Sequence, residues 1–299
     1  MPRPEAEMVV GEALGTDLVT ETAYAKVNLA LHVRERRPDG YHAVESLFVF
    51  ARHGDVLTGR ATGDGGISLT LEGPFGTALD AGAGNLVMKA AMALQQHLGE
   101  TRGAAINLAK YLPVASGIGG GSADAAAALR LLLRLWQVQL PPAELEGIAL
   151  DIGSDVPACL SSATQLVRGR GEVLEPRDVD GLAGRPMLLV NPGLALSTAR
   201  IFDGWDKIDR GPLIADGLDG IVRDGRNDLQ RPAIAAAPVI AEVLEQLEGC
   251  QGVRLARMSG SGATCFALFD DLSERAAAAR ATRAVRPDWW VMETEIRIA

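Results

Sequence analysis

The sequence is poor in cysteine, and its few cysteines lie far apart. Only three occur among 299 residues, at positions 159, 250 and 265. None belongs to a Cys-x-x-Cys pair or to a cluster of cysteine and histidine, which argues against a zinc site and against a disulfide framework. We therefore expect small buried thiols in a protein of a reducing compartment.

Positive charge and long apolar runs are also scarce. Lys and Arg total 29 against 38 Asp and Glu, a formal net charge of −9, which argues against a general nucleic-acid-binding protein. A small anionic ligand in a local basic pocket is compatible with that balance. No apolar run approaches the roughly 18 residues of a membrane span, and residues 1–20 carry acids without the apolar core of a secretory signal. We expect a cytoplasmic protein that acts on small molecules, with no membrane, nucleic-acid or obligate protein partner.

Length and pattern indicate the fold class. A chain of this length corresponds to roughly two domains of about 150 residues each, and it can bury a core without disulfides or metals. Helical and strand patterns do not alternate strictly, so we expect an α+β fold rather than a doubly wound parallel sheet. Residues 178–186 are a candidate linker, and residues 203–226 are expected to form a long loop or mobile flap. Strands are predicted at residues 23–33, 47–50, 67–71, 106–108, 187–190, 253–259 and 264–269, a hairpin at 167–174, and helices at 85–98, 122–136, 143–152, 233–247 and 273–285.

A glycine-rich loop at residues 113–121 is the strongest local signal. Ser122 follows it and opens an alanine-rich helix. Glycine lets the backbone approach a ligand, and a helix N-terminus adds unpaired N–H donors and partial positive charge. Together these features predict a phosphate cradle. A plain turn with a serine cap is the alternative, but it would not need four glycines within five residues. The loop is neither a Walker A nor a dinucleotide-binding motif, and protein-kinase signatures are absent.

A second glycine turn occupies residues 258–264. By itself it could be an ordinary β-turn between two strands. With the first loop, it suggests a phosphate chain that is gripped from two sides.

Two charged residues stand in unusual places. Lys26, one of only four lysines, lies within an apolar strand, where a lysine is costly unless it is paired or solvated. An exposed lysine on an edge strand is the alternative. Asp155 lies between a predicted helix and Pro157, where a cap or turn role is the ordinary interpretation.

Tyr41 and His42 follow the tight turn at residues 37–40. An aromatic pair of this kind suits stacking on a nucleic base. A polar histidine that only satisfies its own hydrogen bonds is the alternative for His42.

These blocks together resemble the GHMP kinases. The resemblance is carried by Ala-Lys-Val-Asn-Leu at 25–29 with Asp-Gly-Tyr-His at 39–42, by residues 112–126 and by residues 258–269. The chain departs from the family at Ala123-Asp124, where Ser-Asn is frequent. The resemblance implies a two-domain α+β fold: a loose tail at residues 1–20, a ribosomal-S5-domain-2-like ATP-binding domain at 21–182 and a ferredoxin-like domain at 183–299.

The resemblance also implies roles for individual residues. Lys26 and Asp155 correspond to the catalytic pair, and Mg²⁺ would bridge the phosphates of ATP, with Ser122 as its candidate protein ligand. The implied ATP-binding residues are Lys110, Pro113, Val114, Ala115, Ser116, Gly117, Ile118, Gly119, Gly120, Gly121, Ser122, Ala123, Gly260, Ser261 and Gly262. The implied substrate-binding residues are Asn28, Tyr41, His42, Thr198 and Phe202, with Tyr41 and Phe202 facing each other across a cytosine ring.

The activity that the resemblance implies is ATP-dependent phosphorylation of the 2-hydroxyl group of a cytidylyl-methylerythritol, in the non-mevalonate route to isopentenyl diphosphate. One alternative is another small-molecule GHMP kinase of the homoserine or mevalonate type, which should lack the Asp-Gly-Tyr-His block. The other is a ligand-sensing protein without activity, which should have lost Lys26 or Asp155. All of these residues are present.

Overall fold

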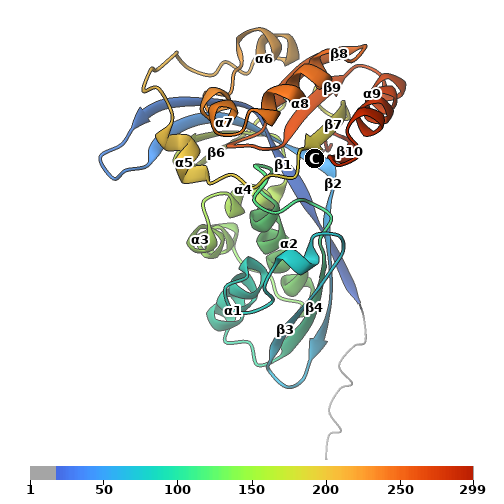
Figure 1. Ribbon diagram of the computed structural model, residues 1–299. Helices are drawn as coiled ribbons and strands as arrows, with labels where there is room; N and C mark the ends of the chain where they lie inside the picture. Colours follow the sequence, from blue (N-terminus) through green and yellow to red (C-terminus); the bar gives the residue numbers. More distant parts are fainter. Residues whose placement is uncertain (1–17, 299) are drawn as a thin grey trace, which may run out of the picture.

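The structure, a computed structural model, describes residues 18–298. The tail expected at residues 1–20 lies outside the described residues as far as position 17, and Val19 and Thr20 already belong to the first strand. Figure 1 shows two lobes, and two long strands, β1 (Val19–Arg36) and β2 (His42–Thr62), run through both of them. Gly40 lies in the connecting turn with φ +85°, where glycine is the residue that adopts this conformation without strain.

The N-terminal sheet is built around this antiparallel pair. Its strands run in the order β3-β4-β2-β5-β6, with β1 paired to β2, and only the β3–β4 pair is parallel. Helix α2 packs against both α1 and β1, so its many alanines form the centre of the core of this lobe. The other elements of the lobe are β3 (Ile67–Glu72), η1 (Gly76–Ala78), α1 (Leu86–Leu98), β4 (Gly103–Ala109), α2 (Gly120–Leu135), α3 (Pro142–Ile152), α4 (Val156–Ser161), β5 (Gln165–Gly169) and β6 (Val173–Pro176).

The C-terminal lobe contains an antiparallel sheet of order β10-β7-β9-β8. Helices α8 and α9 cover one face of this sheet (Figure 1). The elements are β7 (Pro186–Asn191), α5 (Thr198–Asp203), α6 (Leu218–Asp224), α7 (Gln230–Ala236), α8 (Val239–Glu248), β8 (Val253–Met258), β9 (Cys265–Phe269), α9 (Leu272–Val285) and β10 (Trp290–Glu295).

Strand β7 is apolar on both faces because both faces are covered. Leu188 and Val190 pack in the core beneath α8 and α9, whereas Met187 and Leu189 pack with Val27 of β1 in a second core. A strand buried on both faces reads as a continuous apolar run, as this segment does. The second core joins the lobes, and it fixes the position of β1 between them.

Several predicted boundaries are wrong. Helix α2 begins at Gly120 instead of Ser122. The helix expected at 233–247 is two helices, α7 and α8, because Pro238 lacks the N–H group that a continuous helix requires. Segment 203–226 contains α6, so it is not one loop. The candidate linker at 178–186 carries buried Val179 and Leu182 and runs into β7.

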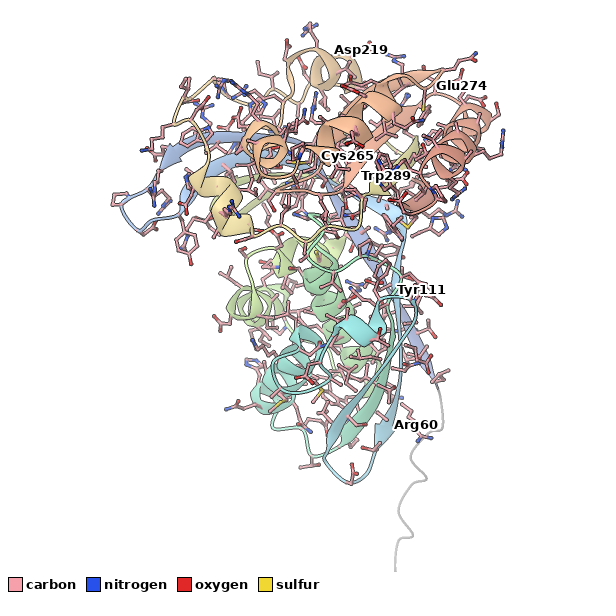
Figure 2. All side chains as sticks on the ribbon, viewed as in Figure 1. Arg60, Tyr111, Asp219, Cys265, Glu274 and Trp289 are labelled. Carbon is pink, nitrogen blue, oxygen red and sulfur yellow. The ribbon has the colours of Figure 1, made fainter. Side chains whose placement is uncertain are left out.

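The cysteines behave partly as expected. Cys159 and Cys265 are buried free thiols and Cys250 is half-buried; Cys265 is labelled within the C-terminal lobe in Figure 2. Burial raises the pKa of Cys159 to about 12, so its thiol stays protonated. Within residues 18–298, no helix combines the length and apolar character that crossing a bilayer requires.

Candidate active site

Three cavities lie next to one another, and the middle one shares lining residues with each of the other two. The middle cavity, of about 390 Å³, is lined by both glycine segments together with Lys26 and Asp155. A second cavity of about 460 Å³ lies on the far side of the first glycine loop and shares Gly120 and Gly121 with the middle one. A third, of about 830 Å³, is lined by Tyr41, His42 and Phe202. We call them the middle, loop-side and aromatic cavities.

The first glycine loop ends in the N-terminus of α2. Gly119 is its N-cap, with φ +62°, and a Cβ there would lie 3.0 Å from Cε of Lys26. The first intrahelical bond runs from the N–H of Ala123 to the carbonyl of Gly119, so the three preceding N–H groups have no intrahelical partner. These groups border the middle cavity. The alternative of a turn capped by Ser122 is therefore wrong, since the helix starts two residues earlier.

The second glycine turn packs directly on the first loop. The Ser259 hydroxyl accepts a hydrogen bond from the Asn28 N–H at 3.1 Å and donates one to the Gly117 carbonyl at 2.9 Å. A Cβ on Gly117 would lie 2.6 Å from the carbonyl oxygens of Ser259 and Gly262. The two loops and β1 are therefore in direct contact, joined through Ser259. Ser259 is a residue that the sequence reasoning did not select.

Lys26 and Asp155 form an ion pair in the middle cavity. The Lys26 ammonium lies 2.9 Å from Oδ2 of Asp155 and 3.9 Å from the ring centre of Phe48. Lys26 is 5% exposed, so it is not the exposed edge-strand lysine of the alternative interpretation. Asp155 occupies the N-cap position of α4, but its side chain caps no N–H group. Its carboxylate, 32% exposed, is therefore directed to Lys26 and the cavity.

Asn28 is held by the protein on both ends of its amide. Its Nδ2 donates to the Ser46 hydroxyl at 2.8 Å, and its Oδ1 accepts from Lys26 at 3.3 Å. The Ser46 hydroxyl in turn donates to the carbonyl of Ala30 at 2.6 Å. Asn28 lines the middle cavity, and its most direct effect is to orient the ammonium of Lys26.

Tyr41, His42 and Phe202, which were expected to bind a base, line one cavity together. The ring of His42 lies 5.0 Å from that of Phe202 at an angle of 32°, and 5.8 Å from that of Trp205, edge-on. Tyr41, 61% exposed, lines the same cavity as Phe202, and its expected place opposite Phe202 across a cytosine ring stays a prediction. Burial, aided by the charge of Arg36, lowers the pKa of His42. The ring is therefore neutral at pH 7 and suited to stacking.

Thr198 lies between the middle and aromatic cavities and lines both of them. It begins α5, and its hydroxyl lies 3.0 Å from that of Ser261 in the second glycine turn. This contact places a residue that was predicted to bind the acceptor substrate beside a residue that was predicted to bind ATP.

Lys110 lines the loop-side cavity, as a residue on the nucleotide side would, but its ammonium is already paired with two carboxylates. It is 2% exposed, and its ammonium lies 2.6 Å from Asp55 and 2.5 Å from Asp124. Asp55 also accepts the N–H groups of Tyr111 and Leu112; Tyr111 is labelled in Figure 2. Burial lowers the pKa of Lys110, but the two carboxylates outweigh it and the net direction is upward. Lys110 thus ties the first turn of α2 to β2, a network that sequence reasoning did not find.

Comparisons with known proteins agree with this arrangement. The family model described as "GHMP kinases N terminal domain" matches residues 85–163, and "GHMP kinases C terminal" matches residues 216–288. The chain is 52% identical to a 4-diphosphocytidyl-2-C-methyl-D-erythritol kinase of Rhizorhabdus wittichii, over 93% of this chain and 94% of that protein. It is 46% identical to a protein of the same name in Brucella abortus, over 92% and 94%.

Solved structures give the same result. A crystal structure of 4-(cytidine 5'-diphospho)-2C-methyl-D-erythritol kinase matches with a TM-score of 0.81 and 31% identity, over 94% of this chain and 100% of that one. A homoserine kinase from Cytophaga hutchinsonii matches with a TM-score of 0.74 at 17% identity, over 97% and 98%. At that identity the second match shows the fold alone.

Proposed function

The chain belongs to the GHMP kinases, and we propose that it transfers the γ-phosphoryl group of ATP to the 2-hydroxyl group of 4-diphosphocytidyl-2-C-methyl-D-erythritol. The products are the 2-phosphate and ADP. The observation that carries the proposal is the Lys26–Asp155 pair, which lies between a helix N-terminus suited to phosphate and a cavity suited to a base.

The order of the cavities fits the two substrates. The loop-side cavity would hold the nucleoside of ATP, and the N–H groups at the start of α2 would hold its phosphates. The aromatic cavity would hold the cytosine against Phe202 and His42. The hydroxyl to be phosphorylated would then meet the γ-phosphate in the middle cavity, beside Asp155.

The chemical work of the protein is positioning and charge neutralisation, because phosphoryl transfer has a loose transition state with little covalent chemistry to catalyse. The Asp155 carboxylate accepts the proton of the 2-hydroxyl group as that oxygen attacks phosphorus. Lys26 holds this carboxylate at 2.9 Å and supplies positive charge where negative charge gathers on the phosphoryl oxygens. No phospho-enzyme is formed in this direct transfer.

The cavity also fits a phosphate-bound magnesium ion. Among residues 18–298, no group of three or more His, Cys, Asp or Glu side chains could hold a metal by itself. Mg²⁺ bound with ATP keeps several waters and takes phosphate oxygens with one or two protein ligands, and Ser122, which lines the middle cavity, is the candidate ligand. When bound, the ion would neutralise phosphate charge.

The test is a comparison of acceptors with ATP and Mg²⁺. Purified protein is incubated with the cytidylyl-methylerythritol, homoserine and mevalonate, ADP release is measured, and the phosphorylated position is identified by NMR. We expect turnover of the first acceptor alone, with phosphate on the 2-hydroxyl group. Preferred turnover of homoserine or mevalonate would overturn the proposal in favour of the other kinases, and ATP binding without turnover of any acceptor would favour a ligand sensor.

A further inference from the structure

The turn between β5 and β6 places an arginine at the junction of two cavities. Gly169 and Gly171 flank Arg170 with φ of +72° and +118°, and the Gly171 N–H donates to the Arg168 carbonyl at 3.2 Å. A Cβ on Gly171 would lie 3.6 Å from the carbonyl of Ser154, the residue before Asp155. The turn therefore packs against the segment that carries the proposed base.

Arg170 lines both the middle and the aromatic cavity. Its guanidinium carbon lies 5.2 Å from the ring centre of Tyr41. The nearest carboxylate oxygen, Oδ2 of Asp39, lies 4.0 Å from its Nη1, which is long for an ion pair. Neither contact is a close bidentate pair, and the side chain is 46% exposed. Arg170 can therefore offer its donors to a ligand. Arg168, on the same hairpin, is instead paired with Glu175 and lines neither cavity.

The charges around the aromatic cavity make this arginine important. Three acidic residues line that cavity, Asp39, Glu172 and Asp203, and Arg170 is the permanent cation among its lining residues. The other basic group there, His42, has a lowered pKa and is neutral at pH 7. In the middle cavity Lys26 is already paired with Asp155. A diphosphate that joins a base in one cavity to a sugar alcohol in the other must pass the junction where Arg170 lies.

We propose that Arg170 binds the diphosphate of the cytidylyl substrate and so selects a nucleoside-diphosphate-linked acceptor over a free polyol. This inference rests on the proposed function. A guanidinium presents several donors in a fixed plane that suits phosphate oxygens, and its place between Tyr41 and Asp155 would set the distance from the base to the reacting hydroxyl.

Ligands of increasing phosphate content test the proposal. Binding of cytidine, CMP and CDP is measured by calorimetry for the wild type, Arg170→Gln and Arg168→Gln, with a non-hydrolysable ATP analogue saturating the nucleotide site. We expect Arg170→Gln to weaken CDP about 10-fold or more, the scale of a charge-assisted hydrogen bond, and to leave cytidine within about twofold. Arg168→Gln should match the wild type for all three ligands, and Arg170→Lys should restore part of the CDP affinity.

Steady-state kinetics give the second measurement. Arg170→Gln should raise KM for the cytidylyl substrate, with kcat and the KM for ATP nearly unchanged. Equal losses for cytidine and CDP would overturn the proposal, since Arg170 would then only shape the base cavity, and so would a CDP affinity equal to that of the wild type. If the wild type binds CDP through Arg170 but does not phosphorylate the cytidylyl substrate, the proposed function fails while the diphosphate site stands.

Discussion

Replacing Ser259 by alanine should loosen the site without touching a reacting group. Ser259 is fully buried, and its hydroxyl joins Asn28 of β1 to Gly117 of the first glycine loop. Alanine fits the space, so the change removes two hydrogen bonds and adds no clash. The buried N–H of Asn28 loses its partner at this position.

The magnitude follows from those two bonds. An ordinary hydrogen bond contributes about 1 kcal/mol net, and a buried donor left without a partner costs about 1–3 kcal/mol. We expect the free energy of unfolding to fall by about 2–4 kcal/mol, within the roughly 5–15 kcal/mol typical of a folded protein. Because the lost bonds hold the glycine loop to β1, part of the free energy of ATP binding is used to order the loop in the variant. Each 1.4 kcal/mol used in this way raises the dissociation constant for ATP tenfold.

The assay is urea unfolding together with ATP binding, and Ser261→Ala is the matched control for the unfolding measurement. The Ser261 hydroxyl, two residues further along the same turn, contacts only the Thr198 hydroxyl at 3.0 Å. Its loss should lower the free energy of unfolding by about 1 kcal/mol or less. An unchanged m value would show that the denatured state is not altered. If the two alanine variants are equally stable and Ser259→Ala binds ATP like the wild type, the assignment of Ser259 as the link between the loops is wrong.

Three further predictions concern single side chains. Asp155→Asn should lower kcat about 100-fold or more, the scale of general-base assistance; near wild-type turnover would exclude Asp155 as the base. Phe202→Ala should raise KM for cytidylyl and uridylyl substrates alike, by roughly 10- to 100-fold, because stacking does not distinguish the two bases. His42→Ala should reduce the preference for cytosine only if the imidazole nitrogens, and not the face of the ring, contact the edge of the base, and kcat/KM for both substrates in both variants decides between the two roles. Burial raises the pKa of Asp124 to about 8 from an ordinary 3.8, so its stabilising contribution is full below about pH 4 and is lost as pH rises through 8. The wild type should therefore lose stability relative to the Asp124→Asn variant as pH rises from 5 to 8. A difference between their free energies of unfolding that stays constant over this range in urea titrations would contradict the prediction.

Much of the site could be predicted because its chemistry is local in the sequence. Gly117 and Gly119 have positive φ. Glycine is the residue that adopts such a backbone conformation most readily, so the glycines of this loop are visible in the sequence as a signal for it. Lys26 and Asn28 share one face of a strand, since successive side chains alternate, and both reach the middle cavity. The individual roles of these residues, and the division between domains at residue 182, stay predictions.

What could not be predicted depends on contacts between distant segments. Asp55 and Asp124 look like ordinary surface charges in the sequence, and only the packing of α2 on β2 buries both of them against Lys110. Arg170 is one arginine among many until the β5–β6 turn sets it between two cavities. The break at Pro238, in contrast, was visible in the sequence, because proline within a helical pattern ends or kinks the helix.

The extent of β1 explains why the reacting groups depend on both lobes. One face of the strand packs with β7 and β9 through Val27, and the other carries Lys26 toward Asp155, 129 residues away in the N-terminal lobe. The N–H of Lys26 also donates to the carbonyl of Ile118 in the first glycine loop. The second glycine turn, from the C-terminal lobe, closes this arrangement through Ser259. Neither lobe contains the ammonium, the carboxylate and both loops by itself, so the packing of the lobes on β1 sets the geometry of the site.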